Sequence, residues 1–349
     1  MSVDRKTQSL HLETNEIIRY ERLILAPGGR PIIPRLEGAD TLAGIFPVRN
    51  LPEAKRTHDW LTKEHRVIVL GGGLVGVKTA AYLMASGFRV SIVEKEDHLL
   101  PLALTSTAAR FIEEHLRRLG IDLFLGKTLQ RAGGENGILK SVVLGGKSVP
   151  CDTLLIAAGS VPNVAFLDGS GLLENGKLLV SSRLQSRDPK IFAAGDAVTI
   201  ETSEGGKITP WTWPQAVSQG RLAAGNLYHP QPLPLKTLTR PNSMNLQGLS
   251  LVMLGAAVKG SEEISYARKD EGVLRQAFLR NGRVTGGVLL GDISNAGPLH
   301  HLIISGKDSG SEAYDLIQAS NRAMPRELLV QGIRRRRARF IYREEKKSC

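Results

Sequence analysis

The stretch VIVLGGGLVGVKTAAYL, residues 67–83, decides which fold the sequence predicts. Its first four residues are apolar and predict a strand, and residues 74–84 predict a helix. Backbone N–H groups at the start of such a helix bind phosphate oxygens. The stretch therefore predicts a pyrophosphate site, with a glycine-rich turn that binds no ligand as the alternative. Three glycines have G-x-G-x-x-G spacing and separate tasks: Gly71 for the tight turn, Gly73 for backbone approach to the phosphates, Gly76 for helix–strand packing.

The residues that follow this helix specify the nucleotide. The segment RVSIVE, residues 89–94, predicts a second strand and begins to close a βαβ unit. Glu94 ends that strand, where a carboxylate accepts hydrogen bonds from a ribose diol and repels a 2′-phosphate. This pattern favours NADH over NADPH, although Lys95 beside it weakens the preference. Leu74 and Val75 complete the set of turn residues expected to contact the cofactor.

Composition limits the other classes of function. The 349 residues, 42% hydrophobic and 23% charged, are typical of a globular protein with two or three domains. The chain has two cysteines, Cys151 and Cys349, in no C-x-x-C pair, so we expect neither a redox dithiol nor a metal site. Cys151 begins an apolar strand and is interpreted as a buried small side chain. We expect a cytoplasmic protein, because no signal peptide or membrane span is evident.

The positive charge is concentrated at the C-terminus. The net charge is +12, and the residues from Ile333 onward include eight basic and two acidic ones. The body is therefore only mildly basic and does not predict nucleic-acid binding. The cluster RRRRAR, residues 334–339, is interpreted as a solvated tail, with contact to RNA or to an acidic protein as the minority alternative.

Four further motifs flank the glycine turn in a fixed order. They are LILAPGGRP at 23–31, LLIAAGSVPN at 154–163, IFAAGDAV at 191–198 and WTWPQAVSQGR at 211–221. The set resembles the FAD-dependent pyridine nucleotide-disulfide oxidoreductase superfamily, and most of all its branch without a redox disulfide. That branch holds NADH oxidases, rubredoxin and ferredoxin reductases, and the flavin part of nitrite reductases. The later stretch GGVLLGDISNAGPLHHLI resembles their C-terminal domain, so the resemblance covers residues 3–307.

The resemblance implies an α/β fold. A Rossmann-type NAD-binding domain is inserted in a partial FAD-binding domain, and a small α+β C-terminal domain follows. The expected segments are 1–50 and 161–232 for the flavin domain, 51–160 for the NAD(P) domain, 233–320 for the C-terminal domain and 321–349 for a basic tail. Periodicity also predicts helices over 51–63, 104–119 and 213–228, and Asn281-Gly282 predicts a hairpin turn.

The resemblance also implies the cofactors and their contacts. FAD accepts a hydride from NADH and passes electrons to a small redox protein: a rubredoxin, a ferredoxin or an iron–sulfur subunit. Asp196 is expected to bind the ribityl hydroxyls and Gly195 to let the backbone approach, with no catalytic acid, base or metal. The other positions implied as cofactor contacts are Ala26, Gly28, Ala158, Gly159, Trp213, Pro214, Gln215 and Ala216.

Three departures from the family pattern motivate an alternative. No strand–GxGxxG–helix for the ADP half of FAD occurs before residue 16, Pro27 replaces a threonine, and Lys78 replaces a glutamate expected near the nicotinamide. The alternative is a truncated or split nucleotide-binding subunit, inactive without a chain that supplies the ADP site. The sequence leaves open whether the protein forms a homodimer.

Overall fold

The computed structural model describes residues 1–201, 206–209, 212–235, 241–257 and 260–318. The chain divides into two compact units. The first combines Met1–Asp97 with Gly120–Arg240, and the second combines His98–Leu119 with Pro241–Cys349. The basic tail expected over 321–349 lies outside the described residues. The domain boundaries drawn from the sequence stay predictions.

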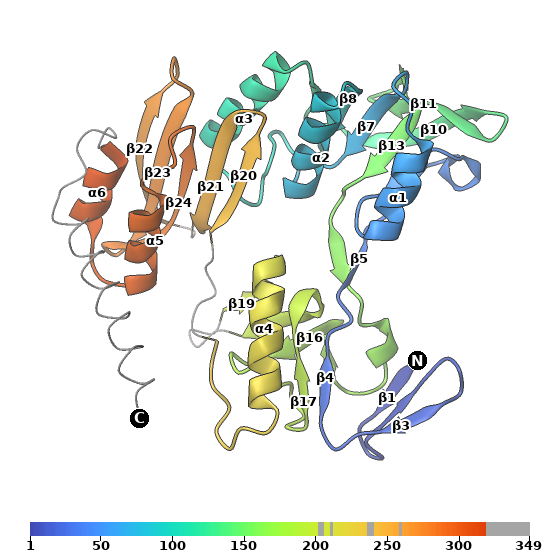
Figure 1. The fold of residues 1–349 in the computed structure, drawn as a ribbon, viewed down its shortest axis with the longest axis vertical. Coiled ribbons are helices and arrows are strands. Elements are labelled where there is room, and N and C mark those ends of the chain that lie inside the picture. The colour runs from blue at the N-terminus through green and yellow to red at the C-terminus, as the bar shows by residue number, and fades with distance from the viewer. Residues whose placement is uncertain (202–205, 210–211, 236–240, 258–259, 319–349) are drawn as a thin grey trace, which may run out of the picture. The chain divides into compact units, whose positions relative to one another are not determined.

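A five-stranded parallel sheet forms one part of the first unit (Figure 1). The three central strands of this sheet are largely apolar and almost fully buried at their centres, as buried parallel strands require. The strand order is β6 (Ile45–Pro47), β13 (Thr153–Ile156), β7 (Arg66–Leu70), β8 (Arg89–Val93) and β9 (Asp122–Phe124). This sheet, with α2 (Leu74–Ala85) between β7 and β8, confirms the predicted α/β class and Rossmann-type unit.

Helix α1 (Leu51–Trp60) connects β6 to β7. It begins with a complete capping box, in which the Asn50 side chain accepts from Glu53 N and the Glu53 side chain accepts from Asn50 N. A three-stranded antiparallel sheet also lies within this unit. Its strands are β10 (Leu129–Glu135), β11 (Ile138–Leu144) and β12 (Lys147–Pro150).

The rest of the first unit consists of short strands around a second core. Strand β4 (Leu23–Leu25) pairs in parallel with β17 (Ile191–Ala193), and β5 (Gly29–Pro31) pairs antiparallel with β14 (Ser160–Pro162). Phe192 at the centre of β17 is fully buried. The remaining elements are β1 (Ser2–Asp4), β2 (Ser9–His11), β3 (Ile17–Arg19), β15 (Leu173–Glu174), β16 (Lys177–Val180), β18 (Val198–Glu201), β19 (Lys207–Ile208), and helix α4 (Trp213–Asn226).

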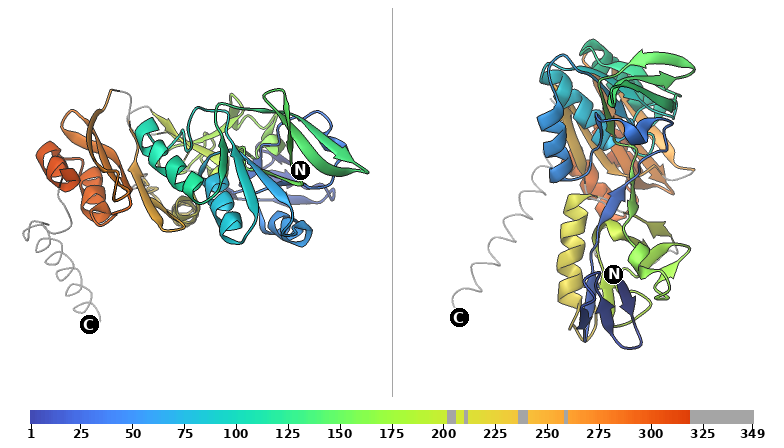
Figure 2. Two further views of the ribbon diagram at one scale, coloured as in Figure 1. Left: turned by 90° about the horizontal axis from the view of Figure 1, so that it is seen from above. Right: turned by 90° about the vertical axis from the view of Figure 1, so that its right-hand side faces the viewer.

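The second unit contains an antiparallel sheet with helices α5 and α6 on one face (Figure 2). Its strand order is β20 (Asn242–Leu246), β21 (Leu249–Gly255), β24 (Arg283–Leu290), β23 (Val273–Arg280) and β22 (Glu262–Arg268). Helices α5 (Ala296–Ser305) and α6 (Gly310–Gln318) bury apolar side chains in one cluster with this sheet. Asn281 and Gly282 both have positive φ, 51° and 72°, which confirms the predicted two-residue hairpin.

The helix boundaries differ from the predictions by a few residues. Helix α3 (Ser106–Arg118), which belongs to the second unit, begins two residues after the predicted start at 104. Thr105 ends the preceding loop, because its hydroxyl accepts from Ala108 N and caps the helix. Helices α1 and α4 begin where predicted and end at Trp60 and Asn226.

A first prediction concerns the two glycines at the start of α2. A Cβ on Gly76 would lie 1.8 Å from the Gly71 carbonyl oxygen, whereas a Cβ on Gly73 would meet nothing within 4 Å. We expect Gly76→Ala to lower the free energy of unfolding by about 2 kcal/mol or more, because backbone atoms must move apart. Gly73→Ala, at φ −75°, is the control and should cost about 1 kcal/mol or less, because alanine is only a poorer N-cap residue. Urea unfolding that gives equal stabilities for the two variants would contradict this reading.

A second prediction concerns the ion pair between Arg66 and Asp152. Arg66 Nε and Nη2 donate to the two carboxylate oxygens at 2.7 and 3.0 Å, and Arg66 N adds a third bond at 3.0 Å. The guanidinium lowers the pKa of Asp152 from 3.8 to about 2. A lowered carboxylate pKa stabilises the fold above pH 3.8, and that contribution is lost as the pH falls toward 2. The stability gap between wild type and Asp152→Asn should therefore shrink over that range, and a constant gap in acid unfolding curves would refute the assignment.

Candidate functional site

The glycine turn is held by backbone contacts at the carboxyl end of β7. Gly71 has φ 111°, and a Cβ there would lie 2.4 Å from the Ala157 carbonyl oxygen. Gly73 is the N-cap of α2 and provides no side-chain cap, so the first N–H groups of a 12-residue helix face an open space. This geometry fits an anionic group such as a pyrophosphate.

The Glu94 carboxylate forms a hydrogen bond to the glycine turn, which the sequence does not indicate. Its carboxylate is buried and accepts from Gly72 N at 2.6 Å and from Glu96 N at 2.9 Å. Each carboxylate oxygen keeps further lone-pair capacity for a ribose hydroxyl. Glu94 therefore fixes the turn as well as offering an acceptor. Lys95 Nζ lies 3.4 Å from Glu96 Oε1, and this ion pair offsets the positive charge of the lysine.

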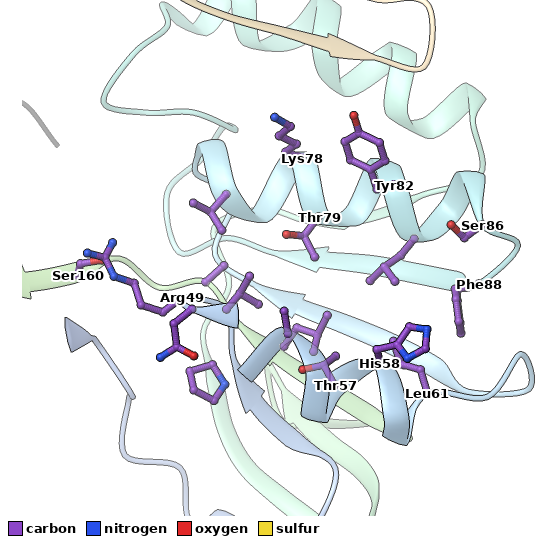
Figure 3. Close-up of a pocket in the computed structure, with 18 of the residues that line it drawn as sticks. Arg49, Thr57, His58, Leu61, Lys78, Thr79, Tyr82, Ser86, Phe88 and Ser160 are labelled. Atoms are coloured by element: carbon purple, nitrogen blue, oxygen red, sulfur yellow. The ribbon is translucent and has the colours of Figure 1, made fainter. Parts of the chain in front are cut away.

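A cavity of about 920 Å³ lies between α1 and α2 (Figure 3). Arg49 and Ser160 lie at one end, and His58 and Phe88 lie at the other. Thr79 of α2 points toward α1, whereas the exposed side chain of Lys78 points away from it. Two predicted cofactor contacts, Val75 and Gly159, line this cavity. No carboxylate does so among the residues that the structure describes, so the lining suits a neutral or anionic ligand group.

The predicted flavin residues gather at the end of β17. Asp196 lies in a single 3-10 turn, Gly195–Ala197, and Gly195 has φ 80°. Gly195 N donates to Gln219 Oε1 at 2.7 Å. Gln219 is fully buried, and its Nε2 has no hydrogen-bond partner in the described part of the chain. A buried donor without a partner, on a side chain that contacts the Gly195 turn, fits a polar ligand edge such as that of a flavin.

The four predicted turn residues of α4 differ in exposure. Trp213 is 82% exposed and Pro214 is also exposed, whereas Gln215 is 3% exposed and Ala216 is half-buried. Thr212, the N-cap of α4, makes no side-chain cap, so the N–H groups of the first turn are open to a ligand. The sequence predicts all four as cofactor contacts and does not indicate which of them are buried.

The segments of the motifs at 23–31 and 154–163, here called the crossover segments, lie side by side. Asn163 N donates to Gly28 O at 2.9 Å, and Ile32 N donates to Gly159 O at 3.0 Å. These bonds flank the β5–β14 pairing and bring the predicted residues Ala26 and Gly28 to the segment that holds Ala158 and Gly159. Since Ala157 in turn contacts the Gly71 turn, both predicted nucleotide sites meet at residues 157–160.

Sequence reasoning missed Arg49, which links these segments. Its guanidinium lies 2.6 Å from Asp196 Oδ2 and also donates to Ser160 Oγ and Gly29 O. One signal was available in the sequence. Arg49 lies two residues after the end of β6 in a parallel sheet, and ligands bind outside the carboxyl ends of such strands.

Cys151 has the structural role expected of it. Its thiol is fully buried and donates to Thr153 O at 3.3 Å. Burial raises the pKa of the thiol to about 12, so a reactive thiolate does not form near neutral pH. Over the described ranges, no group of three or more histidine, cysteine, aspartate or glutamate side chains has metal-binding geometry. None of the helices that the structure describes has the length and apolarity to cross a membrane.

Comparisons with known proteins agree with this architecture. The chain is 27% identical to NADH-dependent phenylglyoxylate dehydrogenase subunit epsilon of Aromatoleum evansii, over 88% of this chain and 73% of that protein. It is 26% identical to rubredoxin-NAD(+) reductase of Pseudomonas putida, over 78% of this chain and 70% of that protein. Among solved structures, the ferredoxin reductase for the CYP199A2 system from Rhodopseudomonas palustris matches 90% of this chain and 79% of its own with a TM-score of 0.83 at 22% identity.

The matches also fix the extent of the family relationship. Some curated relatives are much longer than this chain. The match to nitrite reductase [NAD(P)H] of Bacillus subtilis, for example, covers only 37% of that protein. The model of the pyridine nucleotide-disulphide oxidoreductases matches residues 1–220, which include the glycine turn, both crossovers and Asp196. The chain therefore belongs to the pyridine nucleotide-disulphide oxidoreductase family.

Proposed function

We propose that the chain is an FAD-dependent oxidoreductase that takes electrons from NADH and passes them to a small redox protein. The observation that carries this proposal is that two predicted nucleotide-binding turns come together within one compact unit: the Gly71 turn contacts Ala157, and Arg49 joins the Asp196 turn to Ser160. The relatives named as NADH-dependent or NAD(+)-linked oxidoreductases support the same assignment.

The proposed roles follow from the position of each residue. The open N-terminus of α2, with Leu74 and Val75 behind Gly73, binds the NADH pyrophosphate, and Glu94 accepts from the adenosine ribose. Asp196 accepts from FAD hydroxyls, and the uncapped N-terminus of α4 gives the flavin edge a positive dipole. FAD supplies the capacity to take a hydride and store two electrons. The chain's own residues would bind and orient the two cofactors.

The electron acceptor is proposed from the relatives and from the exposed surface beside α4. Rubredoxin-NAD(+) reductase is named for a small redox protein, and Trp213 offers an exposed aromatic side chain near the predicted flavin contacts. The relative from Aromatoleum evansii is named as a subunit of a larger enzyme. It motivates the second candidate, in which this chain acts as a nucleotide-binding subunit and another chain completes the FAD site.

The direct test of this function uses purified protein with and without added FAD. We expect bound flavin absorbance and NADH-dependent reduction of a dye. Gly73→Ala should keep the flavin and the fold but weaken NADH binding about tenfold or more, because its methyl group occupies the phosphate space. Protein that stays colourless and inactive with added FAD would overturn the stand-alone enzyme. Activity recovered only with a second chain would support the subunit candidate instead.

Coenzyme preference provides an independent prediction. Wild-type protein should have a higher kcat/KM with NADH than with NADPH, because the Glu94 carboxylate repels a 2′-phosphate. Glu94→Gln keeps an acceptor for Gly72 N but removes the charge, so the preference should fall about tenfold. Lys95→Gln is the matched control and should raise the preference or leave it. Equal kcat/KM for both coenzymes in wild type would show that Glu94 does not discriminate.

A further inference from the structure

We propose that a second ligand site lies at the amino end of the parallel sheet and binds a small molecule that carries a phosphate group. A cavity of about 330 Å³ lies there, within the first unit. Arg66 begins β7, Arg89 begins β8, and both side chains line the cavity. The Gly71 turn follows the carboxyl end of β7, so the two sites lie at opposite ends of the same strands. This inference therefore does not rest on the proposed function.

Three cationic side chains from three strands line the cavity. Arg66 and Arg89 are direct partners in the register of β7 and β8, and Lys140 belongs to β11. Among the residues that the structure describes, the side chains of Arg89 and Lys140 have no ion-pair or hydrogen-bond partner. Like charges that are this close repel one another, and an anion between them removes the repulsion.

The two carboxylates at the cavity do not cancel this charge. Asp152 is engaged by Arg66, whose Nε and Nη2 donate to its two carboxylate oxygens at 2.7 and 3.0 Å. Glu64 is exposed, and hydrogen bonds from its own backbone N–H and from the Thr62 side chain lower the pKa of its carboxyl. These bonds hold the Glu64 carboxylate at the 62–64 turn, where solvent screens its charge. Positive charge therefore remains available to an anionic ligand.

A histidine held from behind adds a further donor. The hydroxyl of Thr153, a fully buried residue, accepts from Trp60 Nε1 at 3.2 Å and lies 3.1 Å from His65 Nδ1. An indole N–H only donates, so the hydroxyl hydrogen can be donated to Nδ1. The neutral imidazole then carries its proton on Nε2, and no hydrogen bond to Nε2 is present within the described ranges. His65 thus provides a donor whose ring orientation is fixed before a ligand binds.

The size and the walls of the cavity indicate the class of ligand. Its volume is at the small end of the range for ligand sites. Forked guanidinium donors favour phosphate oxygens, which accept two bonds at once. Trp60 and the 40% exposed side chain of Ile138 add apolar wall next to these donors. Free phosphate and a phosphate ester with a small apolar group share the chemistry that this cavity recognises.

Site-resolved labelling tests the proposal on the full chain, without NADH or FAD. Lysines are acetylated with limiting reagent in phosphate or in chloride at constant ionic strength, and Lys140 is quantified by peptide mass spectrometry. We expect phosphate to slow the acetylation of Lys140 several-fold, because the bound anion holds its ammonium in the cavity. Lys177, also exposed and in the same unit, is the internal control and should react at an unchanged rate. Equal rates for Lys140 in phosphate and in chloride would overturn the proposal.

Substitutions separate this cavity from the glycine turn. Arg89→Gln changes an exposed side chain, so the fold is kept, and the half-protecting phosphate concentration should rise about tenfold. Arg187→Gln is the matched control, because it removes an exposed arginine of the same unit away from the cavity. It should leave the protection of Lys140 unchanged, and so should Gly73→Ala. Protection that survives Arg89→Gln, or that is lost in Gly73→Ala, would contradict the assignment.

A comparison of two probes distinguishes the two sources of the phosphate group. If the cavity takes an ester, phenyl phosphate should protect Lys140 at a concentration several-fold lower than inorganic phosphate, because its ring covers the Trp60 and Ile138 wall. If the cavity takes the free ion, inorganic phosphate should protect at an equal or lower concentration. Both outcomes support an oxyanion site, whereas phenol that protects as well as phenyl phosphate would overturn it.

Discussion

The close approach of two backbone segments at the carboxyl end of β7 is the constraint on which the rest of the structure depends. The Gly71 turn contacts Ala157 on one side and Gly76 on the other so closely that neither glycine has space for a Cβ. This contact opens the N-terminus of α2 toward solvent and brings the second crossover, residues 157–160, beside the turn. The predicted phosphate site and the position of residues 157–160 therefore depend on the same packing.

Polar side chains then hold this arrangement in place. Glu94 holds the glycine turn by accepting from Gly72 N. Arg49 donates to Gly29 O and Ser160 Oγ on the two crossover segments and also to Asp196. Each of these charged side chains forms hydrogen bonds to a segment that the proposed cofactors would contact. Such supporting interactions keep binding groups oriented before a ligand arrives, which lowers the entropic cost of binding.

The parts of the fold that were predictable from the sequence are those specified by local rules. Glycine spacing, the Asn281-Gly282 turn and the start of α1 each depend on residues close together in the chain. The sheet β1–β3 escaped prediction because its strands have three residues each and lie in a polar segment. Arg49 escaped because its partners are far away in sequence, and hydrophobic periodicity carries no information on such contacts. The cofactor contacts proposed for the glycine turns remain predictions from pattern and geometry.

The central claim is that one chain holds NADH and FAD so that a hydride passes between them. Anaerobic titration of the FAD-loaded protein with NADH, followed at the visible absorbance band of the flavin, tests it most directly. One equivalent of NADH per flavin should bleach the band, since each hydride delivers two electrons to one flavin. Bound FAD that stays oxidised in excess NADH would contradict the claim.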